Sequence, residues 1–274
     1  MKISKKTILI VLAFFSIYVV WGSTYLLNKI AVEEIPPLFL SATRFTVAGI
    51  LIFLIAKLLK INLRVSKKQL LNNALAGFLF LVYGNGAFVW SLKFVDSGFA
   101  ALEASTQPLV VLILMRLLYG KKIQRMSLIG VALGFVGIYL LVSQQEIIRH
   151  EGSLLGICII FTCIVSWSFA SLFVAKADMH KNFFVNSGYQ MAIGGMLLFV
   201  FSWSIGEEWV SPMEWSENVQ ISMFLLIIFG SIVAFTAFNY LLKVVSTEKA
   251  ATSSYVNPII ALLLGWYILD EQIT

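Results

Sequence analysis

Long apolar runs dominate the chain and are separated by short polar segments that carry most of its charges. A helix needs roughly 20 apolar residues to cross about 30 Å of hydrocarbon, because it rises about 1.5 Å per residue. The runs lack the strict alternation that is typical of transmembrane barrel strands. The pattern therefore predicts nine membrane-spanning helices, at residues 8–28, 37–57, 73–92, 98–118, 126–143, 154–174, 184–205, 220–242 and 247–269.

The composition favours the same class, an all-α polytopic membrane protein. Hydrophobic residues make up 59% of the 274 residues and charged residues 12%, and the mean hydropathy is +0.91. Soluble domains are about 45–50% apolar and about 25% charged. A water-soluble fold of this length could not bury so many apolar side chains. A soluble enzyme is therefore excluded, and no loop is long enough for a soluble domain.

Basic residues are unevenly divided between the two sides of the predicted topology. If the N-terminus is cytoplasmic, the cytoplasmic segments hold 15 of the 20 Lys and Arg residues, and the outer segments hold Lys29, Lys93 and Arg149. An excess of Lys and Arg on cytoplasmic loops is the usual mark of membrane orientation. Topology thus accounts for the net charge of +6. We expect the lipid bilayer as a partner and no nucleic acid.

Residues suited to metal or covalent chemistry are scarce. Cys158 and Cys163 lie on one apolar span, about 140° apart around the helix, and cannot bond each other. His150 and His180 lie in loops on opposite sides. Catalysis would need a nucleophile with a base, paired carboxylates or a metal. We therefore expect no metal, no cofactor and no catalytic residue, and a membrane-embedded enzyme is the weaker alternative.

The chain repeats itself at an offset of 150 residues. Residues 92–124 align without gaps on residues 242–274, with nine identities in 33 positions, and Pro108 falls on Pro258. Five crossings separate the copies, and this odd number gives the two halves opposite orientations. Inverted repeats that meet near the midplane allow many secondary transporters to alternate access.

The repeat predicts two inverted five-helix halves. The first covers residues 8–143 with spans one to five, and the second covers residues 154–274 with spans six to nine. The first copy continues into span 126–143, whereas the second stops at Thr274. The expected architecture therefore has ten spans, the last of which is missing from this chain.

Short motifs follow in order along both halves: WGSTY at 21–25, PP at 36–37, RF at 44–45, AG at 48–49, GNG at 84–86, YVNP at 255–258 and DE at 270–271. In this order they resemble the EamA family of the drug/metabolite transporter superfamily, over essentially the whole chain. The resemblance implies ten helices with both termini cytoplasmic, a bacterial inner-membrane location, and export or exchange of amino acids or related metabolites. Two features depart from the family: the tenth span is absent, and YGKK at 119–122 replaces an acidic pair.

Polar side chains at membrane depth usually face the bundle interior or a water-filled cavity, because lipid exposure is costly. On this basis a solute site is predicted. Its polar and aromatic members are Trp21, Thr24, Asn28, Tyr83, Asn85, Glu103, Gln107, Trp167, Ser253 and Asn257. The first three share one stripe of the first span. In the third span, helix packing is the alternative role for the glycine-flanked Asn85.

Pro108 and Pro258 are expected to bend the two helices that carry much of this site, because proline removes a backbone donor. Glu103 and Gln107 lie four residues apart on one face, and the repeat places Ser253 and Asn257 on the equivalent face. A solute that needs hydrogen bonds could dock on these faces. Alternatively, the two amide side chains bond neighbouring backbone.

Glu103 is the only acid inside the spans apart from Glu248, which stands at the second residue of the last span. A carboxylate there must be paired, solvated or protonated. Arg44 lies at similar depth, so we expect either an ion pair between the two or an arginine that extends toward the outer interface. A Glu103 that faces the cavity could instead couple proton movement to solute.

The sequence thus predicts a secondary transporter for a small-molecule solute, an amino acid or related metabolite, that works by alternating access. Protons are a candidate coupling ion, and a proton-coupled multidrug exporter is the alternative within transport. A channel or receptor has no distinguishing feature here. Both a monomer and a homodimer are compatible with the pattern.

Overall fold

The computed structural model describes residues 4–122, 129, 133, 136 and 152–269. Eight helices in this part of the chain are long and apolar enough to cross a membrane: Lys5–Val32, Pro37–Leu58, Lys67–Ser91, Ser97–Tyr119, Ser153–Lys176, Phe183–Ser204, Glu217–Val244 and Thr247–Leu269. They coincide with eight of the expected spans and confirm the all-α polytopic class. The remaining expected span, 126–143, lies outside the described helices.

Only three of the eight spans are uninterrupted α-helices, namely α3 (Pro37–Leu58), α9 (Ser153–Lys176) and α10 (Phe183–Ser204). Three spans contain a π-helical segment between two α-helices. The first span consists of α1 (Lys5–Phe15), η1 (Ser16–Val20) and α2 (Trp21–Val32), and the third of α4 (Lys67–Gly77), η2 (Phe78–Ala87) and α5 (Phe88–Ser91). The span Glu217–Val244 consists of α11 (Glu217–Leu225), η3 (Leu226–Phe235) and α12 (Thr236–Val244). Two are broken into α6 (Ser97–Ala104) and α7 (Gln107–Tyr119), and into α13 (Thr247–Ala251) and α14 (Ser253–Leu269). Hydropathy alone gave no sign of the π-helical segments.

The proline helices differ from the expected bends. In the fourth span the chain breaks at Ser105 and Thr106, and Pro108 occupies the first turn of the new helix α7. Proline suits that turn, because the N–H it lacks would have no intrahelical acceptor there. In the last span the break falls at Thr252, and Pro258 lies inside α14. The expectation of one bent helix at each proline was therefore wrong for Pro108, where the helix ends and restarts.

Helices α3 and α10 make the most extensive contact between elements, and they run antiparallel. A Cβ atom at Gly49 would lie 2.8 Å from the backbone nitrogen of Ala192, and one at Gly195 would lie 2.6 Å from the backbone nitrogen of Thr46. Thr46 precedes Gly49 by three residues in α3, whereas Gly195 follows Ala192 by three residues in α10, so the two helices run in opposite directions. The two backbones touch here because neither glycine carries a side chain.

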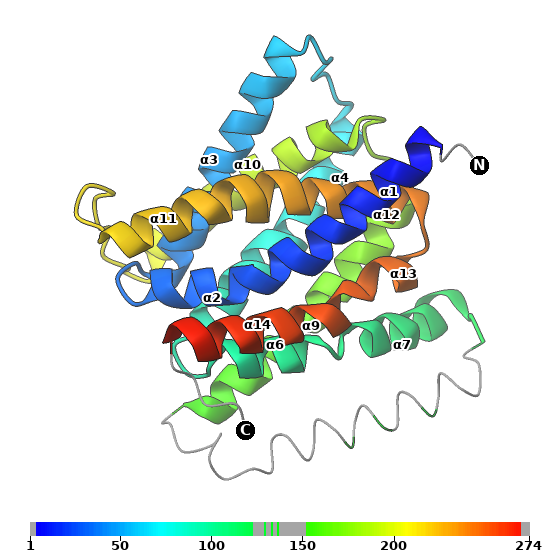
Figure 1. The fold of residues 1–274 in the computed structure, drawn as a ribbon. Coiled ribbons are helices and arrows are strands. Elements are labelled where there is room, and N and C mark those ends of the chain that lie inside the picture. The colour runs from blue at the N-terminus through cyan, green and yellow to red at the C-terminus, as the bar shows by residue number, and fades with distance from the viewer. Residues whose placement is uncertain (1–3, 123–128, 130–132, 134–135, 137–151, 270–274) are drawn as a thin grey trace.

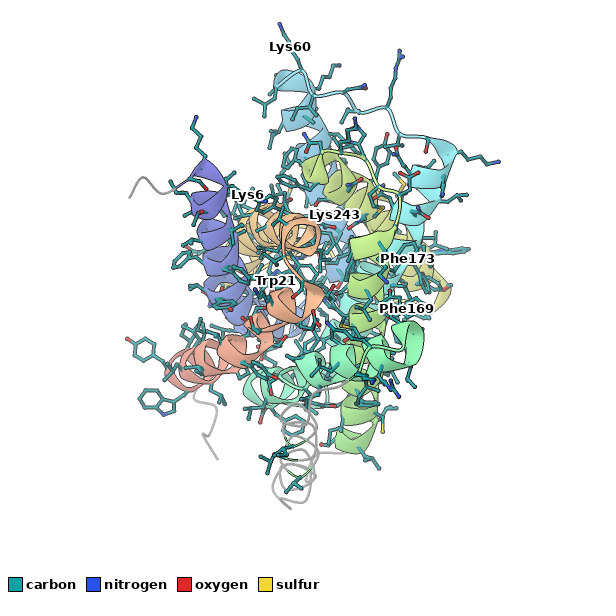
Figure 2. All side chains as sticks on the ribbon, turned by 90° about the vertical axis from the view of Figure 1, so that its right-hand side faces the viewer. Lys6, Trp21, Lys60, Phe169, Phe173 and Lys243 are labelled. Atoms are coloured by element: carbon teal, nitrogen blue, oxygen red, sulfur yellow. The ribbon has the colours of Figure 1, made fainter. Side chains whose placement is uncertain are left out.

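Segment η2 contacts both helices of this pair, η3 contacts α3, and α4 and α12 contact α10. Figure 1 shows the first span, α1 to α2, lying between the span α11 to α12 and helix α14, and these neighbours are in contact. Figure 2 shows Trp21 within the bundle, while Lys6 and Lys60 extend from it. Large apolar side chains along α1 and α14 remain exposed, among them Leu12 and Leu263. Lipid replaces water around such side chains in a membrane.

Polar contacts join the first and last parts of the chain at both ends of the bundle. At one end, the carboxylate of Glu207 accepts the backbone N–H groups of Leu38 (3.1 Å) and Phe39 (2.8 Å) in the first turn of α3. These N–H groups have no intrahelical acceptor, so an anion there is favourable. At the opposite end, Lys121 after α7 forms an ion pair with Glu248 in α13.

A second carboxylate, that of Glu34, links two segments at the same end of the bundle as Glu207. Glu34 accepts the backbone N–H of Ser216, the N-cap of α11, at 2.9 Å. Hydrogen bonding to Ser216 lowers the pKa of the Glu34 carboxyl below its ordinary value. A lowered pKa means that this contact contributes stability above the ordinary pKa of the carboxyl, and that the contribution is lost as pH falls through the lowered value.

Replacing Gly195 by alanine should destabilise the fold, because the new Cβ would force α3 and α10 apart at Thr46. Overpacking of this kind costs about 1–3 kcal/mol, which should appear as a lower midpoint of thermal unfolding in detergent. The control is Met196→Ala, at the next residue of the same helix, because that side chain is 61% exposed. Equal midpoints for the two variants would contradict the close α3–α10 packing.

Candidate functional site

A cavity lies at the centre of the bundle, between elements from both halves of the chain. The space between the atoms around it amounts to about 830 Å³, part of which is open to solvent. Its walls come from α2, α3, η2, α5, α6, α7, α9, η3 and α14. Two of the three π-helical segments contribute lining residues, and so do residues that flank the two helix breaks, namely Ala104, Gln107 and Ser253.

Aromatic rings form much of the wall. The indoles of Trp21 and Trp167 meet edge to face with centroids 5.6 Å apart, and Phe235 lies 6.3 Å from the Trp167 ring. The Trp21 indole N–H donates to the carbonyl of Gly230 at 3.1 Å, which fixes the ring against η3. Phe45 and Phe88 also line the space. These rings offer apolar faces, and aromatic pairs of this geometry add about 0.5–1.5 kcal/mol beyond area burial.

Two amide side chains in the lining carry buried polar atoms that no group in the described part of the chain satisfies. They are Oδ1 of Asn85, in η2, and Nε2 of Gln107, at the start of α7. The other end of Gln107 is occupied, because Ser254 donates its hydroxyl to Oε1 at 2.5 Å. That bond joins the two helix breaks across the cavity. A buried amide atom without a partner is costly unless a ligand or water bonds it.

Arg44 projects from α3 into the same cavity and is 3% exposed. Its Nε donates to the hydroxyl of Ser231 at 2.8 Å, and one terminal nitrogen donates to Oδ1 of Asn28 at 3.3 Å. The guanidinium also lies 4.8 Å from the centroid of the Phe45 ring. Among the lining residues that the structure describes, it is the only charged side chain.

Eight of the ten residues predicted for the solute site line this cavity: Trp21, Thr24, Asn28, Asn85, Gln107, Trp167, Ser253 and Asn257. Their role in binding solute stays a prediction. Thr24 and Asn28 are tied to their own helix, donating to the carbonyls of Trp21 and Thr24 at 2.7 Å. Asn257, with its amide nitrogen turned toward η1, donates to the carbonyls of Ile17 and Tyr18 at 3.0 Å. This is the backbone-bonding role that the sequence left as an alternative.

Two predicted residues lie outside the lining. Tyr83 is 40% exposed and donates its hydroxyl to Thr162 at 3.1 Å, on the outer surface of the bundle. Glu103 is 3% exposed but does not line the cavity, and its Oε2 has no partner in the structure. Its part in proton coupling stays a prediction.

The expected ion pair between Arg44 and Glu103 is absent. Within the described ranges, the ion pair between Lys121 and Glu248 is the one whose charged atoms approach within 4.0 Å. The physical reason is that Arg44 is held by neutral acceptors, Ser231 and Asn28. Equal depth along two helices did not bring the two side chains onto facing surfaces.

Sequence reasoning missed several lining residues, notably Ser254 and Phe235. The repeat contained a signal for both, because an offset of 150 carries Ala104 onto Ser254 and Asn85 onto Phe235, and all four line the cavity. Applying the offset to the predicted Asn85 would have found Phe235, whereas Ser254 is the counterpart of Ala104, which was not among the predicted residues. Among the residues that the structure describes, no group of three or more His, Cys, Asp or Glu could hold a metal ion.

These features define a class: a multi-pass α-helical membrane protein whose two halves enclose a solute-sized cavity, as in membrane transporters. The chain belongs to the EamA-like transporter family, which matches residues 8–143 and 154–274. It is thus a membrane transporter and not an enzyme. A family match over both ranges also agrees with a chain that contains two EamA units.

Known relatives support the assignment. The chain is 35% identical to the uncharacterized inner membrane transporter YedA of Escherichia coli (strain K12) over 263 residues, covering 96% of this chain and 83% of that protein. It is 24% identical to the uncharacterized transporter YoaV of Bacillus subtilis (strain 168), covering 97% and 90%. It is also 24% identical to an S-adenosylmethionine/S-adenosylhomocysteine transporter of Chlamydia trachomatis, covering 92% and 80%. A crystal structure with 19% identity superposes with a TM-score of 0.70 over 97% of this chain and 90% of the other, which shows a shared fold.

The position of the cavity can be tested with cysteine labelling in protein that lacks Cys158 and Cys163. Asn85→Cys should react with a small membrane-impermeant thiol reagent, because position 85 faces the cavity. The matched control is Tyr83→Cys, on the same π-helical segment but on the outer surface, where lipid excludes the reagent. We expect labelling at least about tenfold faster at position 85. Equal rates, or faster labelling at position 83, would contradict an aqueous cavity at this place.

Proposed function

We propose that this protein is a secondary transporter that exports or exchanges amino acids or related small metabolites across the membrane. The observation that carries the proposal is the central cavity, whose walls come from both halves of the chain. A solute site at the interface between two halves can open to either side when the halves move relative to each other.

The antiparallel packing of α3 and α10 supports the inverted relation between the halves, residues 8–143 and 154–274. Each of these helices is the second span of its half, and Gly49 and Gly195 contribute equivalent close contacts to it. The links at the two ends of the bundle, from Glu207 to α3 and from Lys121 to Glu248, are candidates for contacts that break alternately. In this proposal the α3–α10 contact persists while those end contacts open.

The chemistry of the walls supports a small organic solute. Aromatic faces such as Trp21 and Trp167 suit apolar groups, whereas Asn85 and Gln107 offer an unpaired acceptor and an unpaired donor. Sites for small organic ligands commonly combine apolar walls with a few such polar atoms. The Chlamydia relative, named as a transporter of S-adenosylmethionine and S-adenosylhomocysteine, is consistent with a metabolite of this size.

The alternative, a proton-coupled multidrug exporter, has less support from the cavity. Bulky cationic drugs need an acidic or neutral site, and the charged group in this lining is the guanidinium of Arg44. Like charges in a site of low polarity repel strongly. Glu103, the candidate proton carrier, lies behind the lining rather than in it.

The uneven distribution of basic residues supports an N-terminus on the cytoplasmic side. The similarity to an inner membrane transporter of Escherichia coli supports the bacterial cytoplasmic membrane as the location. With that orientation, Lys6 and Lys60 face the cytoplasm, and the end containing Glu34 and Glu207 faces outward. The partners in this proposal are the lipid bilayer and the solute.

Efflux from proteoliposomes tests the transport activity. Vesicles containing the purified protein are loaded with a small-molecule extract of bacterial cytosol, and mass spectrometry of the outside solution identifies compounds that leave faster than from protein-free vesicles. We expect one or more small metabolites to leave, and Gln107→Ala to slow their efflux about tenfold, because it removes the unpaired donor and the bond from Ser254.

The control is Tyr83→Phe, which removes a hydroxyl outside the cavity and should leave efflux unchanged. Efflux identical to protein-free vesicles for every compound would contradict the proposed transport. Normal efflux by Gln107→Ala would show that transport does not use this cavity.

A further inference from the structure

The guanidinium of Arg44 is a buried positive charge with no negative partner among the residues that the structure describes. It is 3% exposed, and its hydrogen bonds go to two neutral oxygens, on Ser231 and Asn28. A guanidinium has five N–H donors in a planar fork, so most of them remain for another acceptor. An unpaired charge in a low-dielectric site is strongly unfavourable, so this part of the cavity suits a negative charge.

The acidic residues of the described ranges do not fill this role. Glu103 lies within the fourth span, but it lies neither in the cavity lining nor within 4.0 Å of the guanidinium nitrogens. Glu34 and Glu207 are engaged at the end of the bundle, where they accept backbone N–H groups. Glu248 is engaged at the opposite end by Lys121.

The guanidinium is also fixed in position before any ligand arrives. The hydroxyl of Ser231 accepts from Nε and donates to the carbonyl of Leu226 at 3.0 Å. Asn28 is oriented in turn by its own bond to the carbonyl of Thr24. Gly230 leaves room for the fork, because a Cβ there would lie 3.0 Å from the second terminal nitrogen of Arg44. Preorganised donors of this kind bind an anion without a large ordering cost.

We propose that Arg44 binds the carboxylate of the transported solute, and that the solute is a monocarboxylate with an apolar or aromatic group, such as a hydrophobic amino acid. This assignment rests on the proposed transport function and specifies its substrate class. Arginine forks match carboxylates with two parallel hydrogen bonds. One cation suits one negative charge, whereas a phosphate or a dicarboxylate would leave excess charge in an aromatic cavity.

The rest of the lining fits the remainder of such a solute. The faces of Trp21 and Trp167 would contact the apolar side chain. The unpaired Oδ1 of Asn85 would accept from an amino group, and Nε2 of Gln107 would donate to the second carboxylate oxygen or to a hydroxyl. The carboxylate provides the essential contact, and the other groups distinguish among carboxylates.

Binding to the purified full-length chain in detergent tests the assignment with two matched ligand series. The first contains L-phenylalanine, 3-phenylpropionate, L-phenylalaninamide and phenethylamine. The second contains L-leucine, 4-methylpentanoate, L-leucinamide and isoamylamine. We expect at least one series in which both carboxylates bind about 10- to 100-fold more tightly than the amide and the amine, because the latter two lack the negative charge that the guanidinium needs.

Two variants assign the preference to one residue. Arg44→Gln should abolish the preference for carboxylates, and Arg44→Lys should retain part of it, because lysine keeps the charge but not the fork. The control is Arg116→Gln, since that arginine bonds the carbonyl of Gly120 at the exposed end of α7 and should leave the preference unchanged. The comparison among ligands on the unmodified protein needs no variant, so it decides the matter even if Arg44→Gln fails to fold.

Equal binding of carboxylate and amide in both series, or an unchanged carboxylate preference in a folded Arg44→Gln protein, would overturn the assignment. Failure of all eight compounds to bind would also overturn the assignment of apolar monocarboxylates as the substrate class. In each of these cases, efflux from proteoliposomes would still support a transporter of another solute class. Conversely, carboxylate binding that needs Arg44 without any efflux would support the site and contradict the proposed transport.

Discussion

The close packing of α3 against α10 is the contact on which the arrangement of this transporter depends. Two glycines, Gly49 and Gly195, bring the backbones together at points where a side chain would clash. In a membrane, helices associate through such small-residue surfaces, because lipid is as apolar as the side chains and the hydrophobic effect therefore does not drive helices together. The same helix α3 carries Arg44 on the face that lines the cavity. Fixing α3 on α10 therefore also fixes the guanidinium in the site.

Irregular backbone gathers around the cavity in the same way. Segments η2 and η3 and the breaks at residues 105–106 and at Thr252 all adjoin its lining. Irregular backbone at membrane depth is tolerated where protein or a water-filled space surrounds it, because lipid cannot satisfy the exposed N–H and C=O groups. π-helical turns also occur often at functional sites. The bond from Ser254 to Gln107 shows how one break supplies a donor to the other.

Much of this arrangement could be predicted from the sequence, since eight expected spans coincide with helices and hydropathy reports burial in lipid directly. Polar and aromatic residues within the spans correctly indicated eight of the lining residues, because polar groups at membrane depth usually face the bundle interior or a cavity. The sequence failed where two helices must be rotated relative to each other: Arg44 and Glu103 share a depth but do not meet. It also placed Tyr83 in the site, although this side chain, within the π-helical segment η2, lies on the outer surface. The rotation of a helix about its axis and its local pitch depend on the elements it packs against, and a hydropathy pattern carries no information about these.

The central claim is that the two halves move about the α3–α10 contact and so open the cavity alternately to each side. Pulsed electron resonance on the reconstituted protein tests it most directly, with one spin-label pair at positions 121 and 248 and a second pair at Leu54 and Met196, on exposed faces of α3 and α10. If the halves move in this way, we expect two distance populations for the first pair and one narrow population for the second, because only the end contact breaks. A single narrow population for the first pair, or two populations for the second, would contradict it.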